Sequence, residues 1–180
     1  HDLIQKTIAD HKRIIFNGDG YSAEWEKEAE KRGLLNLRST VDALPLLKSE
    51  DNIALFERHG VLNRAEINSR VDIVLENYTK TIHIEALTLL EMINREVIPA
   101  ITSYSNLLCE TINNKTSIRV DSSVEYELLS RLNACNKELF TLSSALKMAV
   151  ASAERTNDIL KKATEYHDDI LKIMADIRKY

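Results

Sequence analysis

The 180-residue chain contains little glycine and proline, with four and two residues respectively. Long stretches without either residue favour helices over a fold built from short strands and turns. Cysteine is also scarce, and the two residues, Cys109 and Cys135, stand in no CxxC or Cys/His spacing. Neither a disulfide framework nor a zinc site is therefore expected. We expect both thiols to be reduced and buried in a cytoplasmic protein.

Long apolar runs and blocks of one charge are missing as well. No apolar run reaches the length of about 18 residues that indicates a membrane-spanning helix. The net charge is −4, and the basic residues are interspersed with acidic ones. Such a surface attracts nucleic acid and anionic lipid weakly, so neither is expected as a partner. No signal peptide is visible, and the polar, helix-like start without methionine is typical of a cut inside a longer protein.

Residues 1–60 have the pattern of several short helices. A first helix is expected to end near His11, followed by a short β-like run at residues 13–16. Asn17, Gly18, Asp19 and Gly20 are predicted to form a turn, because glycine adopts positive φ angles without steric cost.

Capping residues define the next short helices. Ser22 can accept a hydrogen bond from a free first-turn N–H group, which predicts a helix that begins there. Gly33 is expected to end that helix in the left-handed conformation. Ser49 or Asp51 is expected to begin a later short helix, which Gly60 ends.

Residues 61–180 have a different pattern, with long helical periodicity. From Asn63 to about Asn113, apolar residues recur every three or four positions, which predicts one long helix. Pro99 is expected to kink it, because proline removes a backbone hydrogen bond and clashes with the preceding turn. The predicted buried stripe consists of Ile67, Val71, Val74, Tyr78, Ile82, Ala86, Leu90, Ile93, Val97, Ile101, Tyr104 and Leu108.

Two further long helices are expected after a loop at residues 113–117. The first is capped by Asp121, Ser122 or Ser123, of which Ser122 has capping-box spacing with Glu125. The second follows a break near residues 153–157. Their stripes are Leu128, Leu132, Cys135, Leu139, Leu142, Leu146 and Ala149, and then Ile159, Ala163, Tyr166, Ile170, Ile173, Ile177 and Tyr180. This spacing predicts an all-α fold, an antiparallel bundle of three long helices preceded by several short ones. An intermolecular coiled coil remains an alternative.

No arrangement of side chains indicates an active site. The histidines are scattered and no HExxH motif occurs, and His83 and Glu85 lie two apart on a helix, so they cannot chelate together. Asp168 and Asp169 diverge by about 100° on a helix. The sequence therefore predicts no catalytic, cofactor-binding or metal-binding residue. The tyrosines of the stripes are expected at the bundle edge: Tyr78, Tyr104 and Tyr166.

The turn at Asn17 to Gly20 has a weak likeness to phosphate-binding and calcium-binding loops. It lacks the Lys-Ser/Thr pair of a P-loop and the spaced carboxylates of a calcium loop. A plain turn is favoured. A contact of Lys12, Arg13 or the turn with an anion or nucleotide in a longer protein stays open.

Several blocks of the sequence closely resemble type III glutamine synthetases, in the segment that follows the catalytic core. The blocks are Lys-Arg-Ile-Ile-Phe-Asn-Gly-Asp-Gly-Tyr-Ser at 12–22, Glu-Trp at 24–25, Glu-Ala-Glu-Lys-Arg-Gly-Leu at 28–34, Asn-Leu at 36–37, Thr-Val-Asp-Ala-Leu-Pro at 40–45, Glu-Asn-Tyr at 76–78, Lys-Thr-Ile at 80–82, Ile-Glu-Ala-Leu-Thr at 84–88, and Arg-Glu at 95–96 before Pro-Ala at 99–100. The resemblance weakens after about residue 105.

The resemblance implies a parent enzyme that joins glutamate and ammonia using ATP and Mg²⁺ in a large homo-oligomer. The family's metal, nucleotide and glutamate sites lie upstream, so no catalytic residue carries over to this chain. The implied role is a non-catalytic helical part, with residues 1–60 following the catalytic core and residues 61–180 forming the bundle. Its partners would be the upstream catalytic domain and neighbouring subunits. The alternatives are a free-standing interaction or oligomerisation module and, less favoured, a ligand-sensing bundle.

An excess of apolar residues in the first part supports docking to a missing partner. Short helices bury little surface alone, so several large side chains should stay exposed or mediate contacts between copies. These side chains are Trp25, Leu34, Leu35, Leu37, Leu46 and Leu47.

Overall fold

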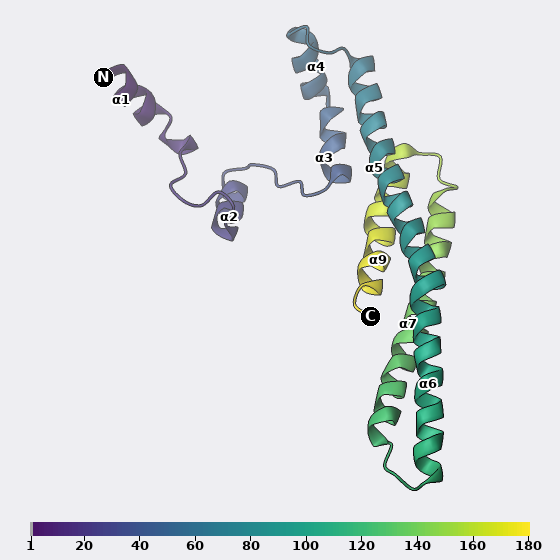
Figure 1. The fold of residues 1–180 in the computed structure, drawn as a ribbon. Helices are drawn as coiled ribbons and strands as arrows, with labels where there is room; N and C mark the ends of the chain where they lie inside the picture. The colour runs from purple at the N-terminus through teal and green to yellow at the C-terminus, as the bar shows by residue number, and fades with distance from the viewer. Residues whose placement is uncertain (1) are drawn as a thin grey trace. The chain divides into compact units, whose positions relative to one another are not determined.

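The computed structural model describes residues 2–180, and all their regular structure is helical, which confirms the all-α class (Figure 1). The chain forms two compact units, one up to Ser39 and the other Thr40–Tyr180. In the first unit α1 spans Asp2–Asp10 and α2 spans Ala23–Lys31. The Ser22 hydroxyl accepts from the Trp25 N–H at 3.3 Å, and Gly33 has a φ of +76°, so both predicted ends of α2 are confirmed.

The β-like run predicted at residues 13–16 is wrong. A short 3-10 turn, η1, spans Lys12–Ile14, and Ile15 is extended. A strand needs a hydrogen-bonded neighbour, and no strand occurs among residues 2–180 to supply one. The predicted turn is displaced, because the Ser22 N–H donates to the Asp19 carbonyl at 3.1 Å and the hydrogen-bonded turn therefore covers residues 19–22 rather than 17–20. Gly18 and Gly20 do not have positive φ angles.

The second unit begins with two short helices that pack against a long one. Helices α3 (Thr40–Leu47) and α4 (Glu50–Arg58) both contact α5 (Arg64–Met92). Ser49 caps α4, and Gly60 follows it with a φ of +65°, as predicted. Because of these contacts, residues 40–60 belong to the second compact unit, and the boundary along the chain falls after Ser39. The sequence-based division falls at residue 60 instead. That division remains a prediction about the parent protein.

The long helical pattern from Asn63 onward consists of three segments. A π-helical turn, η2 (Ile93–Val97), joins α5 to α6 (Ile98–Ser117), and Pro99 is the second residue of α6. Val97 and Ile98 keep helical φ and ψ angles and the Ile98 N–H donates to the Ile93 carbonyl, so the helix continues through the π-helical turn up to the proline, which has no N–H to donate. The kink predicted at Pro99 remains a prediction.

The loop predicted at residues 113–117 is wrong, because α6 continues to Ser117. Arg119, two residues after the end of α6, turns the chain out of the helix with a φ of +59°. The Val120 N–H then donates to the Lys115 carbonyl at 2.9 Å, and the Arg119 N–H donates to the Thr116 carbonyl at 3.1 Å. This is a Schellman ending without the glycine that normally marks it in a sequence.

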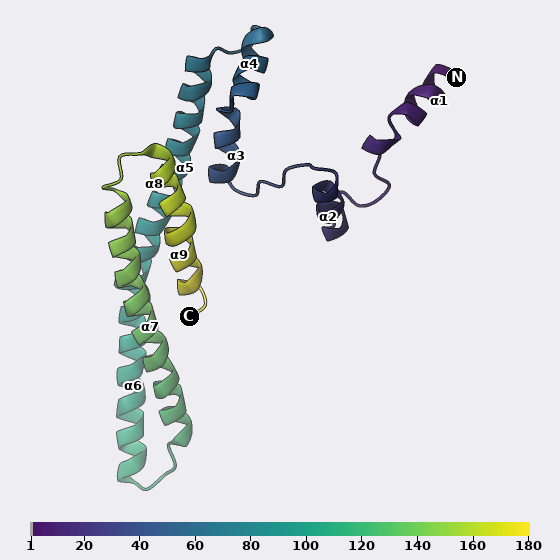
Figure 2. The same ribbon diagram turned by 180° about the vertical axis from the view of Figure 1, so that it is seen from behind.

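The chain then reverses and runs back along α6 and α5 (Figures 1 and 2). Helix α7 spans Ser123–Ala153. The predicted capping box is absent, since the Ser122 side chain makes no cap bond and Glu125 instead pairs with Lys115 at 2.6 Å. Asp121 performs the capping role by accepting from the Ser123 N–H at 3.3 Å.

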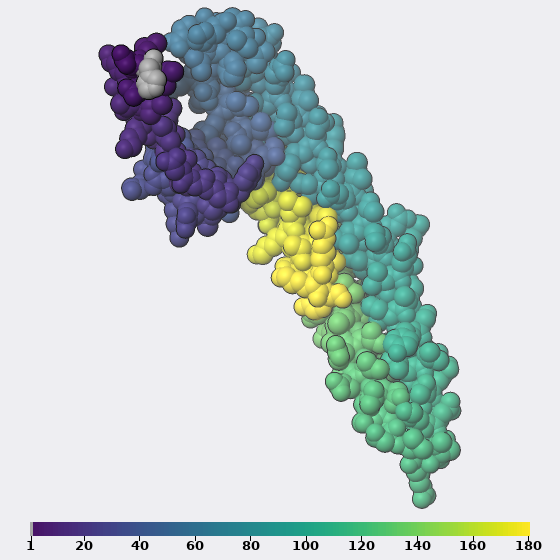
Figure 3. Space-filling model, turned by 60° about the vertical axis from the view of Figure 1, so that its left-hand side comes forward, coloured from purple at the N-terminus to yellow at the C-terminus, as the bar shows by residue number. Residues whose placement is uncertain are grey.

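The last helical stretch follows the predicted break and packs on α5 and α7. It comprises α8 (Ile159–Glu165), a second π-helical turn, η3 (Tyr166–Ile170), and α9 (Leu171–Ile177). In the space-filling view, α6 and α7 form the narrow end of the second unit, beyond α9 (Figure 3).

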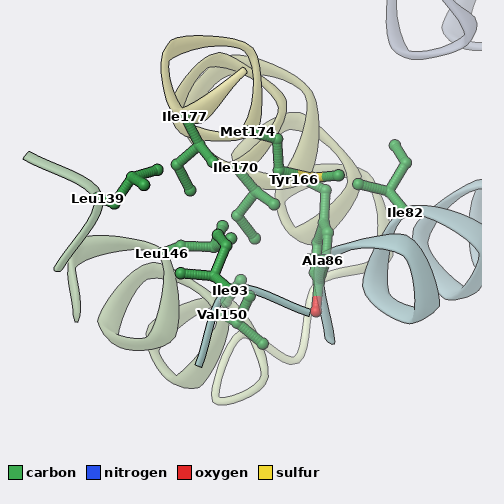
Figure 4. Close-up of a cluster of buried hydrophobic side chains, with 11 residues drawn as sticks. Ile82, Ala86, Ile93, Leu139, Leu146, Val150, Tyr166, Ile170, Met174 and Ile177 are labelled. Carbon is green, nitrogen blue, oxygen red and sulfur yellow. The ribbon is translucent and has the colours of Figure 1, made fainter. Parts of the chain in front are cut away.

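The main core lies where α5, η2, α7, η3 and α9 meet (Figure 4). Its buried residues are Ile82, Ala86, Ile93, Leu139, Leu146, Val150, Ala153, Tyr166, Ile170, Met174 and Ile177. The predicted stripes are only partly buried. Leu128 is 36% exposed on the first half of α7, and on α5 Leu75 is buried where Val74 was expected.

The start of α5 is held by a capping box between Asn63 and Glu66, which a substitution can test. The Asn63 side chain accepts from the Glu66 N–H at 2.9 Å, and Glu66 accepts from the Asn63 N–H at 2.8 Å. We expect Asn63→Ala to lower the free energy of unfolding by about 1 kcal/mol, because a first-turn N–H loses its acceptor. Chemical denaturation measures this, with Asn133→Ala on the exposed face of α7 as the control. Equal effects of the two substitutions would contradict the capping role.

Candidate functional site

One polar cluster of the second unit joins three side chains from three elements. His83 comes from α5, Glu154 is the C-cap of α7, and Tyr166 begins η3. The Tyr166 hydroxyl lies 2.7 Å from His83 Nδ1 and donates to Glu154 Oε1 at 2.9 Å. Lys162 Nζ lies 3.6 Å from the same Glu154 oxygen. The cluster therefore ties the end of α7 to both α5 and the last helical stretch.

The hydrogen-bond directions follow from the number of protons available. An ionised carboxylate only accepts, so Tyr166 uses its single proton toward Glu154. The Tyr166 oxygen must then accept from His83 Nδ1, which places a proton on that nitrogen. The hydrogen bond from Tyr166 lowers the pKa of Glu154, and Lys162 and His83 lower it further. Burial, together with the nearby Glu154 carboxylate, raises the pKa of Tyr166, so its hydroxyl stays protonated.

The prediction that Tyr166 lies at the bundle edge is wrong, since it is fully buried with 0% exposure. Figure 4 shows its side chain among those of the core. The contact with His83 spans 83 residues of sequence, and no local periodicity reports such a pair. The only local signal is the position of Tyr166 on a stripe of core residues. His83 is half-buried, and Tyr104 is exposed as expected.

A groove of about 560 Å³ opens beside this cluster. One wall is the face of α5 that carries Glu76, Lys80 and His83, and the opposite wall is formed by Glu154 and the start of α8. The remaining lining residues are Thr79, Ile84, Thr156, Asn157, Ile159 and Lys162. The groove thus has the size and mixed lining of a small-molecule site.

In the first unit, the Arg32 side chain binds the backbone just before the Asn17–Gly20 segment, for which the sequence left an anion contact open. Its guanidinium donates to the carbonyls of Arg13 at 3.0 Å and Ile15 at 3.3 Å. It also pairs with Glu28, one helical turn earlier, at 2.6 Å. The guanidinium lies 6.0 Å from the centre of the Phe16 ring and 5.8 Å from that of Trp25, a cation–π arrangement. Arg32 thereby fixes the backbone of residues 13–15 against α2.

The structure places the basic residues and the turn on the surface. Lys12 and Arg13 are exposed, as are Asn17, Gly18, Asp19 and Gly20. The Asp19 carboxylate accepts from the Tyr21 N–H at 2.9 Å, so it stabilises the turn. Gly18 lies against the Phe16 ring, where an added Cβ would approach ring atoms to 2.6 Å. This packing accounts for glycine at that position.

Most of the apolar residues singled out in the first 60 positions remain on the surface. Leu34, Leu35 and Leu37 are exposed in the first unit, and Leu46 and Leu47 are exposed in the second. Trp25 is half-buried against Phe16, with ring centres 4.7 Å apart. None of these side chains is fully buried, as expected for a region with a further binding partner.

The expectation that both cysteines are buried is wrong. Cys109 is exposed on α6 and Cys135 is half-buried on α7. Cys109 lies about 100° around the helix from the buried Leu108, outside the buried stripe. Within residues 2–180, no group of three or more His, Cys, Asp or Glu side chains could hold a metal ion. Over the same residues, no helix is long and apolar enough to cross a membrane.

These observations define an all-helical chain with exposed apolar side chains and a polar groove beside His83. Residues 1–116 match the family model described as the glutamine synthetase C-terminal domain. The chain belongs to the glutamine synthetase family.

Three glutamine synthetase sequences align with this chain over 99% of its length. A glutamine synthetase of Butyrivibrio fibrisolvens is 38% identical over 181 residues, and a type-3 glutamine synthetase of Dictyostelium discoideum is 32% identical over 184 residues. A glutamine synthetase of Bacteroides fragilis is 28% identical over 186 residues. The chain spans about a quarter of the length of these relatives, 26% of the first and 25% of the others.

Proposed function

We propose that the chain is the non-catalytic C-terminal helical part of a type-3 glutamine synthetase, a cytoplasmic ATP-dependent glutamate–ammonia ligase. The observation that carries this proposal is a similarity that spans 99% of this chain and only about a quarter of each relative. The remaining three quarters of such a protein leave room for the catalytic machinery. In this proposal the last three helical stretches act as an antiparallel bundle, kinked near Pro99.

The side chains of this chain do not fit a magnesium site. Mg²⁺ prefers several carboxylate and water oxygens in a near-octahedral arrangement. Residues 2–180 bring no three potential ligand side chains together for a metal. We therefore assign Mg²⁺ and ATP to the remainder of the parent enzyme and derive no chemical step from the residues present here.

The role that we propose is packing against the upstream catalytic domain and neighbouring subunits of a homo-oligomer. Leu34, Leu35 and Leu37 support it, because they leave a cluster of exposed apolar side chains directly before the second unit. Exposed apolar surface of this kind is typical of an interface from which the partner is missing. In the same proposal, residues 1–60 follow the catalytic core and residues 61–180 form the bundle.

Activity measurements test the assignment of chemistry to the missing part. We expect the purified 180-residue chain to form no glutamine from glutamate, ammonia and ATP with Mg²⁺. A full-length type-3 glutamine synthetase in the same assay is the positive control. Turnover that follows this chain through purification, free of host enzyme, would refute a non-catalytic role.

A free-standing oligomerisation module is the second candidate, favoured by the exposed apolar residues of the long helices, such as Phe140 and Leu107. Light scattering of the chain distinguishes the two proposals. If residues 34–37 normally dock on the rest of the parent protein, they are uncovered in the isolated chain and should cause weak self-association. The double substitution Leu34→Lys and Leu35→Lys should then remove it. A free-standing module predicts a stable oligomer that the same substitutions leave unchanged.

A further inference from the structure

The groove beside His83 contains charges that a packing role does not require. Three basic side chains line it, Lys80 and His83 from α5 and Lys162 from α8. Two carboxylates line it as well, Glu76 from α5 and Glu154 from the end of α7. Lys80 pairs with Glu76 at 3.2 Å, and Lys162 lies 3.6 Å from Glu154. With a protonated His83, three cations face two carboxylates. The excess of one positive charge matches a ligand with one negative charge.

The two nitrogens of the His83 ring have different roles. Nδ1 donates to Tyr166, whose hydroxyl donates in turn to Glu154. Nε2 has no hydrogen-bond partner among residues 2–180, and the His83 side chain is 29% exposed at the groove. A second proton would therefore enter at Nε2. Glu154 Oε1 lies 3.9 Å from Nδ1, at ion-pair distance when the ring is protonated.

The backbone around Tyr166 supports a role beyond packing. Tyr166 opens the π-helical turn η3, and π-helical turns inside α-helices occur frequently at functional sites. Because the Tyr166 side chain is fully buried, its hydroxyl has a fixed position between His83 and Glu154. The relay thus holds the ring with Nε2 available, before any ligand is bound.

We propose that this groove binds a small organic monoanion through its carboxylate group, and that binding is accompanied by protonation of His83 at Nε2. The carboxylate accepts from the His83 Nε2–H and from Lys162, while the apolar body of the ligand lies against Ile84 and Ile159, which line the same groove. Inorganic phosphate, with up to two negative charges and no apolar body, fits less well. This site is additional to the packing role and does not depend on it.

Titration of the ¹⁵N-labelled 180-residue chain with butyrate, followed by NMR, tests the proposal. We expect butyrate to shift amide signals of residues 76–84 and 154–162. Butyramide, the neutral analogue, and phosphate should shift them little. Because only a protonated ring with Nδ1 already bonded to Tyr166 presents an N–H at Nε2, butyrate should bind at least about fivefold more tightly at pH 6 than at pH 8. Equal binding of butyramide or phosphate, equal affinity at both pH values, or shifts confined to other regions would overturn the proposal.

Two substitutions separate the site from a general effect on folding. His83→Gln should remove the pH dependence and weaken butyrate binding about tenfold, whereas His59→Gln, at the exposed end of α4, should change neither. Lys162→Gln should weaken binding while the pH dependence remains, which provides a second test if His83→Gln is unstable. Wild-type binding by both groove variants, each with wild-type thermal unfolding, would contradict the proposed contacts.

Discussion

Leu146→Ala is expected to lower the free energy of unfolding of the second unit by about 3–5 kcal/mol. Leu146 is fully buried, with 0% exposure, and lies in the cluster formed by α5, η2, α7, η3 and α9 (Figure 4). The substitution removes apolar atoms from a site with neighbours from several helices, which cannot all move inward to fill the space. A cavity therefore adds to the loss of transfer free energy. Urea or guanidinium denaturation followed by circular dichroism measures the change.

Leu128→Ala is the matched control, because it makes the same chemical change on the same helix and the same predicted stripe. Leu128 is 36% exposed, so water already covers part of its side chain. We expect a cost of about 1 kcal/mol or less, since little apolar area and no closed cavity are involved. Similar effects of the two substitutions would show that the third helical stretch does not pack on α7 as described.

Tyr166→Phe is expected to destabilise the second unit by about 1–2 kcal/mol. The ring remains in the core, so the change isolates the hydroxyl that joins His83 to Glu154. Both partners lose a hydrogen bond, although Glu154 is 49% exposed and regains part of it from water. Tyr126→Phe on the exposed side of α7 should cost less than about 0.5 kcal/mol. Equal costs would mean that the Tyr166 hydroxyl does not contribute.

The difference between wild type and Tyr166→Phe should depend on pH. The folded state lowers the pKa of Glu154 below its ordinary value, chiefly through the Tyr166 hydrogen bond. A group with a lowered folded pKa stabilises the protein above its unfolded pKa, and this contribution is lost as the pH falls through the folded pKa. The destabilisation by Tyr166→Phe should therefore be largest above about pH 5 and should shrink toward pH 3. Unfolding curves at these pH values measure it, and an unchanged difference would contradict the hydrogen bond to Glu154.

Local features of the helices were predictable because they depend on neighbouring residues. Ser22 and Ser49 cap their helices through side-chain hydrogen bonds to nearby N–H groups, and Gly33 and Gly60 end helices with positive φ angles. The end of α6 was missed because Arg119 adopts the left-handed conformation that glycine usually signals.

Contacts between helices that are distant in sequence determine which apolar residues are buried and which polar side chains form hydrogen bonds. The α8–α9 stretch covers the part of α7 from Leu139 onward, so Leu146 is buried and Leu128 is not, although both fit one period. His83 and Tyr166 meet across 83 residues of sequence. The sequence by itself determined the helical class, the ends of α2 and α4, and the family, because these depend on short-range hydrogen bonding and on residue identity. Only the tertiary structure decided the core and the groove, because burial depends on where a distant helix begins and ends.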